Sequence, residues 1–352
     1  MTHADHRAPA TGATFEPRVT PWQAAALEPA PSAPFDEAAR AFVRAAVLAP
    51  SGHNTQPWRF AVREPDVLVF ADPSRRLPVA DPDDRELTMS LGAAVMNLRA
   101  AAAHGGYGSA VTAGAGAEEA ARVRLTAGGA DAGLAALFPA VTARRTWRLA
   151  FAGADLPAAA WEALRGVNAL GPAQALIIDD EARRGALVAL IEEGDHRRMS
   201  DKAFRTELAS WMRPARSGAS DGLAGDSLGL SPFASDLAAW STRAFDMGRS
   251  VAKKDAALAT ESAALAVIVA PDEPSALVDA GQLLERILLT AALHGVSASF
   301  FNLPVEVPAL RDRMQEVLAT ETRPQLLFRL GRKGDAELKP SARRPLDEVL
   351  AG

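Results

Sequence analysis

The sequence of 352 residues contains no cysteine. This absence excludes disulfides, thiolate metal sites, iron–sulfur ligation and a cysteine nucleophile. No run of 18 apolar residues occurs, so no membrane span is predicted. The N-terminal stretch "MTHADHRAPATGATFEPRVTPWQ" also lacks the apolar core of a secretory signal. We therefore expect a soluble cytoplasmic protein.

An excess of positive charge is also missing. The chain carries 38 Lys and Arg against 43 Asp and Glu, a formal net charge of -5. Such a balance provides no general attraction to nucleic acid or to an anionic membrane. We therefore expect neither nucleic acid nor a membrane as a partner. With 48% hydrophobic residues, the chain can form one large or two ordinary domains.

Several familiar site motifs are absent or incomplete. There is no P-loop, and Gly114 and Gly116 are not followed by the third glycine of a dinucleotide fingerprint. The six histidines are scattered, and the acidic run Asp81 to Glu86 reads as a solvated turn, so no metal site is predicted. The segment "GDSLG" from Gly225 matches G-x-S-x-G, which leaves a hydrolase as one alternative. Its flanks are rich in Gly and Ser instead of forming a strand and a helix, which favours a chance match.

Helical and strand-like patterns alternate from about Phe35, after a polar, proline-containing tail (residues 1–34) that we expect to be disordered. In the first helix, Asp36 is a candidate N-cap and Pro50 ends the helical pattern. Spacing and composition predict helices at 35–49, 88–105, 157–170 and 276–295, and strands at 59–64, 67–72, 121–127, 173–180, 263–272, 296–301 and 323–332. This alternation predicts an α/β fold.

Two helical segments of the chain resemble each other. Residues 97–105, "NLRAAAAHG", align without a gap with residues 287–295, "ILLTAALHG", and both end in His-Gly. Ala- and Leu-rich helices are often alike, but the strand order that follows each segment also matches. We interpret this as an internal duplication, with a first half at 35–138 and a second half at 139–352.

The second half contains a long insertion at about 200–250. Its centre, residues 217–235, is rich in Gly and Ser and is typical of a lid or a loop without regular structure. Aromatic and Met side chains flank it: Trp211, Met212, Trp240, Phe245 and Met247. They could face a ligand, but packing of the lid against the body is the interpretation we favour.

Two polar motifs remain unexplained by packing. The loop "APSGHNTQPWRF" begins at Ala49 and concentrates polar side chains that can bind backbone groups. In "RRTWR", the residues Arg144, Thr146 and Arg148 alternate, so in an extended segment they could face one anion together. Guanidinium groups and a hydroxyl suit a phosphate monoester. A second arginine segment near the C-terminus supplies Arg343 and Arg344, and for either arginine segment alone a surface cluster of ion pairs is the interpretation we favour.

Together these segments resemble the FMN-dependent nitroreductase superfamily. The loop is similar to that family's A-P-S-x-x-N-x-Q-P-W run, and "RRTWR" resembles its R-x-S-x-R stretch. "LPVEV" at 303–307 resembles its P-x-E segment, and "RRPLDEVL" at 343–350 its C-terminal ending. Ordinary members begin with the arginine motif, whereas here that motif lies in mid-chain. The order therefore most resembles the large, fused, Acg-like branch.

This resemblance implies a nitroreductase-like α/β fold with a mixed sheet flanked by helices. It also implies that two related halves of one chain mimic the family's dimer, so that the protein is a monomer with one composite site. FMN would lie between the loop of the first half and the arginine motif of the second. The residues implied to bind it are Pro50, Ser51, Gly52, Asn54, Gln56, Arg144, Thr146, Arg148, Pro304, Val305, Glu306, Arg343 and Arg344.

The roles implied differ along the flavin. Arg144, Thr146 and Arg343 would bind the phosphate, while Arg148 would lie along the ribityl chain and pyrimidine edge. No side chain is implied as a catalytic acid or base, because flavin N5 carries the hydride. NAD(P)H would reduce FMN, and a nitroaromatic or quinone would reoxidise it in a ping-pong cycle. The alternative is storage of FMN beneath a closed lid.

Three positions depart from the family pattern. Ser341 occupies the place of a usual lysine, and the phenylalanine after the arginine motif comes one residue late, at Phe151. Val307 replaces a usual glycine after the P-x-E glutamate. The valine side chain narrows the predicted approach to N5, which is why the storage alternative is retained.

Overall fold

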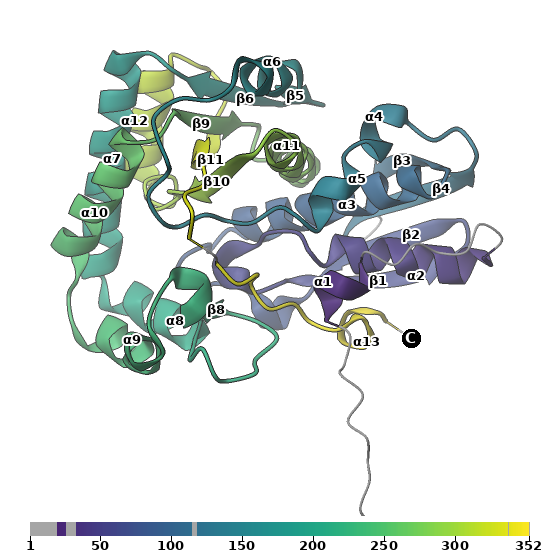
Figure 1. Cartoon of the computed structure of the whole chain (residues 1–352), viewed down its shortest axis with the longest axis horizontal. Coiled ribbons are helices and arrows are strands. Elements are labelled where there is room, and N and C mark those ends of the chain that lie inside the picture. The colour runs from purple at the N-terminus through teal and green to yellow at the C-terminus, as the bar shows by residue number, and fades with distance from the viewer. Residues whose placement is uncertain (1–19, 26–32, 115–117, 337, 352) are drawn as a thin grey trace, which may run out of the picture.

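The computed structural model describes residues 20–25, 33–114, 118–336 and 338–351, which fold into two lobes lying side by side (Figure 1). Each lobe contains a sheet whose neighbouring strands are antiparallel, and helices cover it. The α/β class predicted from the sequence is confirmed. Within these residues, no helix has the length and apolar character needed to cross a membrane.

The first lobe is built from residues 35–141. Its elements are α2 (Phe35–Ala46), β1 (Trp58–Arg63), β2 (Asp66–Ala71), α3 (Arg85–His104), β3 (Tyr107–Ala113), β4 (Glu119–Ala127), α4 (Ala132–Ala135) and α5 (Phe138–Val141). The sheet has the order β1-β2-β4-β3. Phe42, Val43 and Ala46 of α2 are buried on one helix face, as their spacing predicts, and belong to the same apolar core as residues of α3.

Two details of the first lobe differ from the sequence prediction. Pro34 occupies the N-cap of α2 without a side-chain hydrogen bond, so Asp36 is not the cap. It lies in the first turn, where its charge complements the helix dipole and pairs with Arg40. The strand β3 was not predicted, because its small residues face solvent on the edge of the sheet and show no apolar alternation.

The second lobe repeats the architecture on a larger scale. Its elements are α6 (Ala158–Gly166), β5 (Ala169–Leu170), β6 (Ala173–Ile178), β9 (Ala264–Val269), α11 (Pro274–Leu293), β10 (Val296–Phe300), α12 (Pro308–Leu318) and β11 (Pro324–Arg332). The sheet has the order β10-β11-β9-β6-β5. All six residues of β9 are buried, because helices cover both faces of its sheet.

The two sheets share one connectivity. In the first lobe, the strands in chain order occupy the spatial order first, second, fourth, third. Without the two-residue β5, the second lobe has the same order, β6-β9-β11-β10. In both lobes a helix of 20 residues, α3 or α11, connects the second and third strands.

The helices α3 and α11 pack directly on each other between the lobes (Figure 1). A Cβ added at Gly92 of α3 would overlap the carbonyl oxygen of Val278, and one added at Gly281 of α11 would overlap that of Met89. The contact is reciprocal, since the glycine of each helix meets the residue three places before the glycine of the other. Such mutual contacts characterise a twofold-related interface.

The insertion of the second lobe separates β6 from β9. It contains α7 (Glu181–Ser200), α8 (Lys202–Trp211), β7 (Met212–Arg213), β8 (Leu223–Ala224), η3 (Gly225–Leu228), α9 (Pro232–Ala244) and α10 (Gly248–Thr260). The helices α7 and α10 pack together, and their apolar residues join the core against β9. The segment 200–250, predicted as a lid, is therefore largely helical.

Two segments of the chain, one C-terminal and one in mid-chain, pair with the edges of the two sheets. The C-terminal segment leaves the second lobe, runs to α13 (Leu346–Val349) and pairs Leu350 with Phe60 of the first (Figure 1). Thr146, conversely, pairs with Ala298 beside the second sheet. Both pairings are parallel, but among the described residues they are isolated bridges. In the described residues, the strands within each lobe's sheet thus pair antiparallel, and the parallel pairing of the predicted mixed sheet is limited to isolated bridges and to the two-stranded β7-β8 sheet.

The structure describes only part of the N-terminal tail. Of the predicted tail at 1–34, residues 1–19 and 26–32 lie outside the described residues. In the described part, α1 (Pro21–Ala24) forms a helical turn before the boundary predicted at 34. Its Trp22 donates a hydrogen bond to the carbonyl oxygen of Ser341, 2.9 Å away.

Candidate functional site

The loop after α2 has an unusual backbone. His53, Asn54 and Gln56 have φ values of 48°, 55° and 53°, which place three non-glycine residues in the left-handed region. Each such residue is strained by roughly 1–3 kcal/mol, and such strain concentrates at functional sites. The loop is held by contacts such as the 2.9 Å hydrogen bond from the Gln56 amide to Ser51 Oγ.

Asn54 joins the loop to two distant segments. Its Nδ2 donates to the carbonyl oxygens of Gly222 (2.9 Å) and Ala342 (3.1 Å), and its Oδ1 accepts from Arg343 at 2.9 Å. The residue is buried, so these contacts replace water at the amide group. The loop, the insertion and the C-terminal segment therefore share one anchor.

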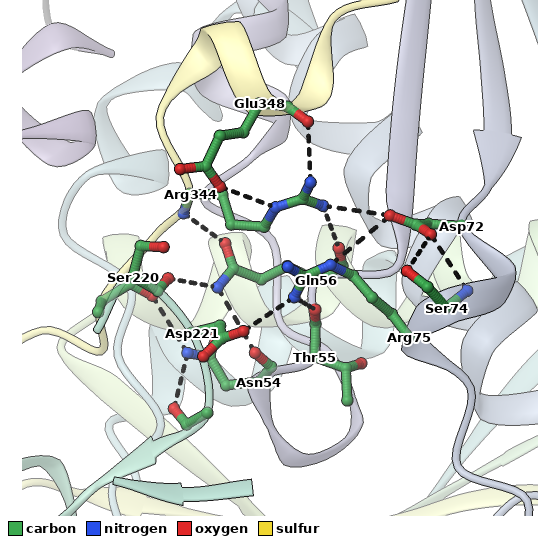
Figure 2. Close-up of polar contacts among 12 residues, drawn as sticks. Asn54, Thr55, Gln56, Asp72, Ser74, Arg75, Ser220, Asp221, Arg344 and Glu348 are labelled. Carbon is green, nitrogen blue, oxygen red and sulfur yellow. Dashed lines mark hydrogen bonds and ion pairs between the residues drawn. The ribbon is translucent and has the colours of Figure 1, made fainter. Parts of the chain in front are cut away.

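Gln56 also binds both the insertion and the C-terminal segment, as Figure 2 shows. Its Nε2 donates to the carbonyl oxygen of Ser220 at 2.8 Å, and its Oε1 accepts from the Arg344 amide at 2.8 Å. Arg75 adds an ion pair of 3.0 Å to Asp221. We call residues 220–222 the clasp, because they tie the insertion to the first lobe.

Two predicted phosphate ligands lie behind the loop. Arg343 donates to the carbonyl oxygens of Leu48 and Ala49 at 3.0 Å each, and Arg144 donates to that of Leu48 at 2.9 Å. Both arginines are buried. Arg144 Nε also lies 3.1 Å from Glu285 Oε1. In the structure these arginines hold the loop in place.

Positive charge exceeds negative charge in this buried region. Arg144, Arg145 and Arg148 all act on Arg343, whose pKa is held well below its usual value by burial and by their repulsion. Burial, with Arg144, lowers the pKa of Arg148 to about 10. Among the described residues, Glu285 is the one carboxylate that acts on Arg343, and Arg343 Nε has no acceptor. Such an excess favours a bound anion.

A cavity of about 500 Å³ opens beside the loop. Its volume falls within the range of small-molecule sites. Six of the predicted residues line it, three from the first half and three from the second: Pro50, Ser51, Gly52, Thr146, Arg148 and Glu306. The structure thus brings both halves of the predicted composite site to one cavity.

The other predicted residues do not line this cavity. They are Asn54, Gln56, Arg144, Pro304, Val305, Arg343 and Arg344. Arg344 lies close to Asp72 and Glu348, and its guanidinium donates to the Gln56 carbonyl oxygen (Figure 2). Pro304 packs directly on Gly194 of α7, and the Val305 carbonyl oxygen accepts a hydrogen bond from Arg85.

The cavity wall contains the predicted residue Glu306 together with two titratable residues that the sequence analysis did not select, Glu86 and His53. Glu306 pairs with Arg198 at 2.9 Å, and burial raises its pKa to about 7 despite that arginine. Burial, followed by repulsion from Glu306, raises the pKa of Glu86 well above its usual value. The pKa of His53 is shifted downwards instead: burial, together with repulsion from Arg198 and Arg148, lowers it to about 4. His53 is therefore neutral at pH 7, with Nε2 buried and unpaired.

Three further residues of the wall come from outside every predicted motif: Asp195, Asp255 and Arg329. Asp195 belongs to α7, Asp255 to α10 and Arg329 to β11. The sequence offered a usable signal only at Arg329, which interrupts an apolar run, whereas Asp195 and Asp255 lie beside other charged residues. Within the part of the chain that the structure describes, no group of three or more His, Asp or Glu residues could hold a metal ion.

The chain is similar in sequence to two proteins that are both named as putative NAD(P)H nitroreductases. The chain is 31% identical over 334 residues to "Putative NAD(P)H nitroreductase Rv3131" of Mycobacterium tuberculosis strain H37Rv, covering 90% of this chain and 92% of that protein. It is 27% identical over 314 residues to "Putative NAD(P)H nitroreductase acg" of the same strain, covering 88% and 93%. No protein-family model matches the chain.

Among solved structures, the chain is similar to the FMN-dependent nitroreductase NfnB from Mycobacterium smegmatis, crystallised in complex with NADPH. That similarity has 18% sequence identity and a TM-score of 0.42, and covers 61% of this chain and 97% of NfnB.

Proposed function

Because the chain belongs to the nitroreductase family, in the branch of Rv3131 and Acg, we propose that it binds FMN and uses NAD(P)H to reduce a small acceptor. The observation that carries this proposal is the composite cavity. Ser51 of the first half and Thr146 and Arg148 of the second line the same space of about 500 Å³. The family resemblance assigns the flavin to the meeting point of these motifs.

The buried arginines fit the charge of the cofactor. Arg148 lines the cavity, and the repulsion between Arg144, Arg145, Arg148 and Arg343 is offset by one carboxylate, Glu285. A phosphate monoester carries about -1.5 to -2 charges at pH 7 and would relieve this repulsion. Thr146 and Arg148 would contact it or the adjoining chain directly. Arg144 and Arg343 would act from behind the loop, through Leu48 and the charge they contribute.

The protein's own groups orient and shield the bound molecules. FMN would supply hydride transfer from NAD(P)H to a nitroaromatic or quinone acceptor, in two half-reactions. The strained loop at Ser51 to Gln56 fixes the first-half wall of the cavity. Leu223, Leu228 and Leu230 of the insertion also line the cavity and would limit access of water.

We further propose that the two lobes mimic a family dimer within one chain. The shared strand order and the reciprocal glycine contacts of α3 and α11 support this interpretation. The loop of the first lobe and the arginine motif of the second then play the parts that two subunits share in ordinary members. The protein would accordingly act as a monomer with one flavin.

Storage of FMN is the second candidate, and the clasp is the observation that favours it. Residues 220–222 are bonded to Asn54, Gln56 and Arg75, so the insertion is fixed to the loop in this state. A reductase must release its products on the turnover timescale, whereas a storage protein need not.

One experiment tests the proposal and separates the two candidates. The absorption spectrum of the purified protein should show bound oxidised flavin, which should bleach within seconds after anaerobic addition of NADH or NADPH. Flavin that stays oxidised for many minutes yet dissociates intact would favour storage. A colourless protein that takes up no added FMN would contradict both.

A pair of variants tests the proposed location. Arg148→Ala removes a charge-assisted contact worth roughly 1.5–3 kcal/mol, so the Kd for FMN should rise about tenfold or more. Arg165→Ala, on the exposed surface of α6, is the matched control and should leave the Kd unchanged. Equal affinities for the two variants would place the flavin elsewhere.

A further inference from the structure

Two carboxyl groups meet in the wall of the cavity. Asp195 lies on α7 and Asp255 on α10, two helices that pack against each other. Both residues line the cavity together with Ser51, Thr146 and Arg148. Neither belongs to a motif that the family resemblance assigns to the flavin.

The two carboxyl groups lie close enough to interact directly, since each shifts the pKa of the other. An ionised carboxylate only accepts hydrogen bonds, so a hydrogen bond between two carboxyl groups requires a proton on one of them. Asp195 is 1% exposed, and no N–H or O–H group of the described residues donates to its Oδ2. A proton shared with Asp255 would satisfy this buried group.

Neighbouring charged groups act on the pKa values of both carboxyl groups, some raising and some lowering them. Burial, then Asp255, then Glu306 raise the pKa of Asp195 to about 9. Lys254 and Arg329 act on Asp255 in the opposite direction. Glu306 comes this close because α7 has a glycine, Gly194, against the backbone of the loop that carries it. The pair thus has both acidic and basic neighbours.

We propose that Asp195 and Asp255 hold one proton between them and donate it to an oxygen atom of the acceptor, which suits acceptors of the quinone class. Apolar side chains line the same cavity, among them Met199, Leu258 and Phe301. This environment fits a neutral, flat ring whose carbonyl oxygen reaches the acid. The inference rests on the proposed function and adds a proton donor to it.

The reaction balances with the reductant already proposed. A quinone becomes a hydroquinone by gaining two electrons and two protons, and NAD(P)H supplies a hydride, which is one proton with both electrons. The second proton comes from the pair: its O–H bond breaks as an O–H bond forms on the quinone oxygen. The pair then carries two negative charges and regains a proton from water.

Infrared spectroscopy tests the shared proton without any turnover. At pH 8, the wild-type spectrum minus that of Asp195→Asn should contain the C=O band of a protonated carboxyl group, and the band should titrate away near pH 9. Glu192→Gln, an exposed carboxylate on the same helix, is the matched control and should produce no such difference. Absence of the band from the wild-type difference spectrum would overturn the inference.

Kinetics test the donation. Ferricyanide accepts electrons without a proton, so the ratio of kcat with benzoquinone to kcat with ferricyanide isolates proton delivery. That ratio should fall by about 100-fold or more in Asp195→Asn and in Asp255→Asn, as for loss of a general acid, and should not change in Glu192→Gln. A ratio that stays constant in both Asp variants would overturn the inference.

The outcomes separate this inference from the proposed function. Wild-type protein whose bound flavin is not reduced by NAD(P)H would contradict the reductase, and with it the donation step. The infrared band would still report the shared proton. Normal reduction by NAD(P)H with a constant ratio would instead support the reductase and contradict the donor.

Discussion

Asn54 shows how much one side chain contributes to this site. Its amide group binds Gly222 of the clasp, Ala342 of the C-terminal segment and the guanidinium of Arg343. Its backbone has φ 55°, a conformation that asparagine tolerates better than most residues. The residue therefore combines a local backbone requirement with contacts between three segments.

We expect Asn54→Ala to lower the free energy of unfolding by about 1–3 kcal/mol or more, because buried partners lose their hydrogen bonds. Asn54→Gly loses the same bonds but accepts the positive φ, so it should be more stable than the Ala variant by roughly 1 kcal/mol. Urea denaturation measures both. Hydrogen exchange at residues 220–222 should also accelerate in both variants. Protection equal to that of the wild type would contradict the anchoring role.

Glu285 predicts a dependence of stability on pH. Burial raises its pKa from 4.5 to about 7, although Arg144 opposes the shift. The folded protein therefore binds this proton more tightly than the unfolded chain does. The resulting stabilisation is complete below pH 4.5 and is lost as the pH rises towards 7.

We expect Glu285→Gln to remove this dependence. From pH 4.5 to 7, the free energy of unfolding of the wild type should fall relative to that of the variant by up to about 3 kcal/mol. Urea denaturation across this range measures the difference. Glu273→Gln, an exposed carboxylate at the start of the same helix, should show no such trend. Parallel curves for wild type and Glu285→Gln would contradict the prediction.

At the scale of elements, the contact between α3 and α11 depends on two glycines. Gly92 and Gly281 let the two helix backbones approach until no Cβ fits between them. Glycine in a helix interior is otherwise unfavourable by roughly 0.5–1 kcal/mol relative to alanine. Its presence at both positions is therefore explained by packing and not by helix propensity.

Gly92→Ala and Gly281→Ala should each destabilise the protein by about 1–3 kcal/mol or more, because the added methyl meets backbone that cannot rotate away. Gly185→Ala on α7 is the control, since a Cβ there has no neighbour within 4 Å. It should stabilise the protein by roughly 0.5–1 kcal/mol. Thermal or urea denaturation compares the three. A destabilised Gly185→Ala with unaffected Gly92→Ala would contradict this account.

At the scale of the whole molecule, the arrangement of the lobes predicts a monomer. In the proposed pseudo-dimer, α3 and α11 of one chain would take the place of the interface between subunits. The two helices pack on each other, and the C-terminal segment crosses to β1 within the chain. Size-exclusion chromatography with light scattering should therefore give a mass near 36.9 kDa. A mass of twice that value at micromolar concentration would contradict the prediction.

The sequence by itself determined the elements whose signals are local. The apolar period of α2, the continuous Ala, Val and Ile run of β9 and the alternation around Trp58 were predicted close to their observed bounds. Periodicity reports burial along one segment, so these predictions needed no knowledge of its partners. The polar loop after Pro50 and the family were also apparent, because their motifs are contiguous in the chain.

Only the tertiary structure decided which distant groups meet. Arg343 reaches Asn54 across 289 positions of sequence, and it binds behind the loop although its motif suggested a phosphate. Asp195 and Asp255 come together because α7 packs on α10, and nothing in either local sequence specifies that packing. Strand direction was decided in the same way, since parallel pairing in the described residues is limited to isolated bridges and to β7-β8. Strand direction within a sheet follows from how segments assemble, whereas burial periodicity is alike in parallel and antiparallel strands covered on both faces.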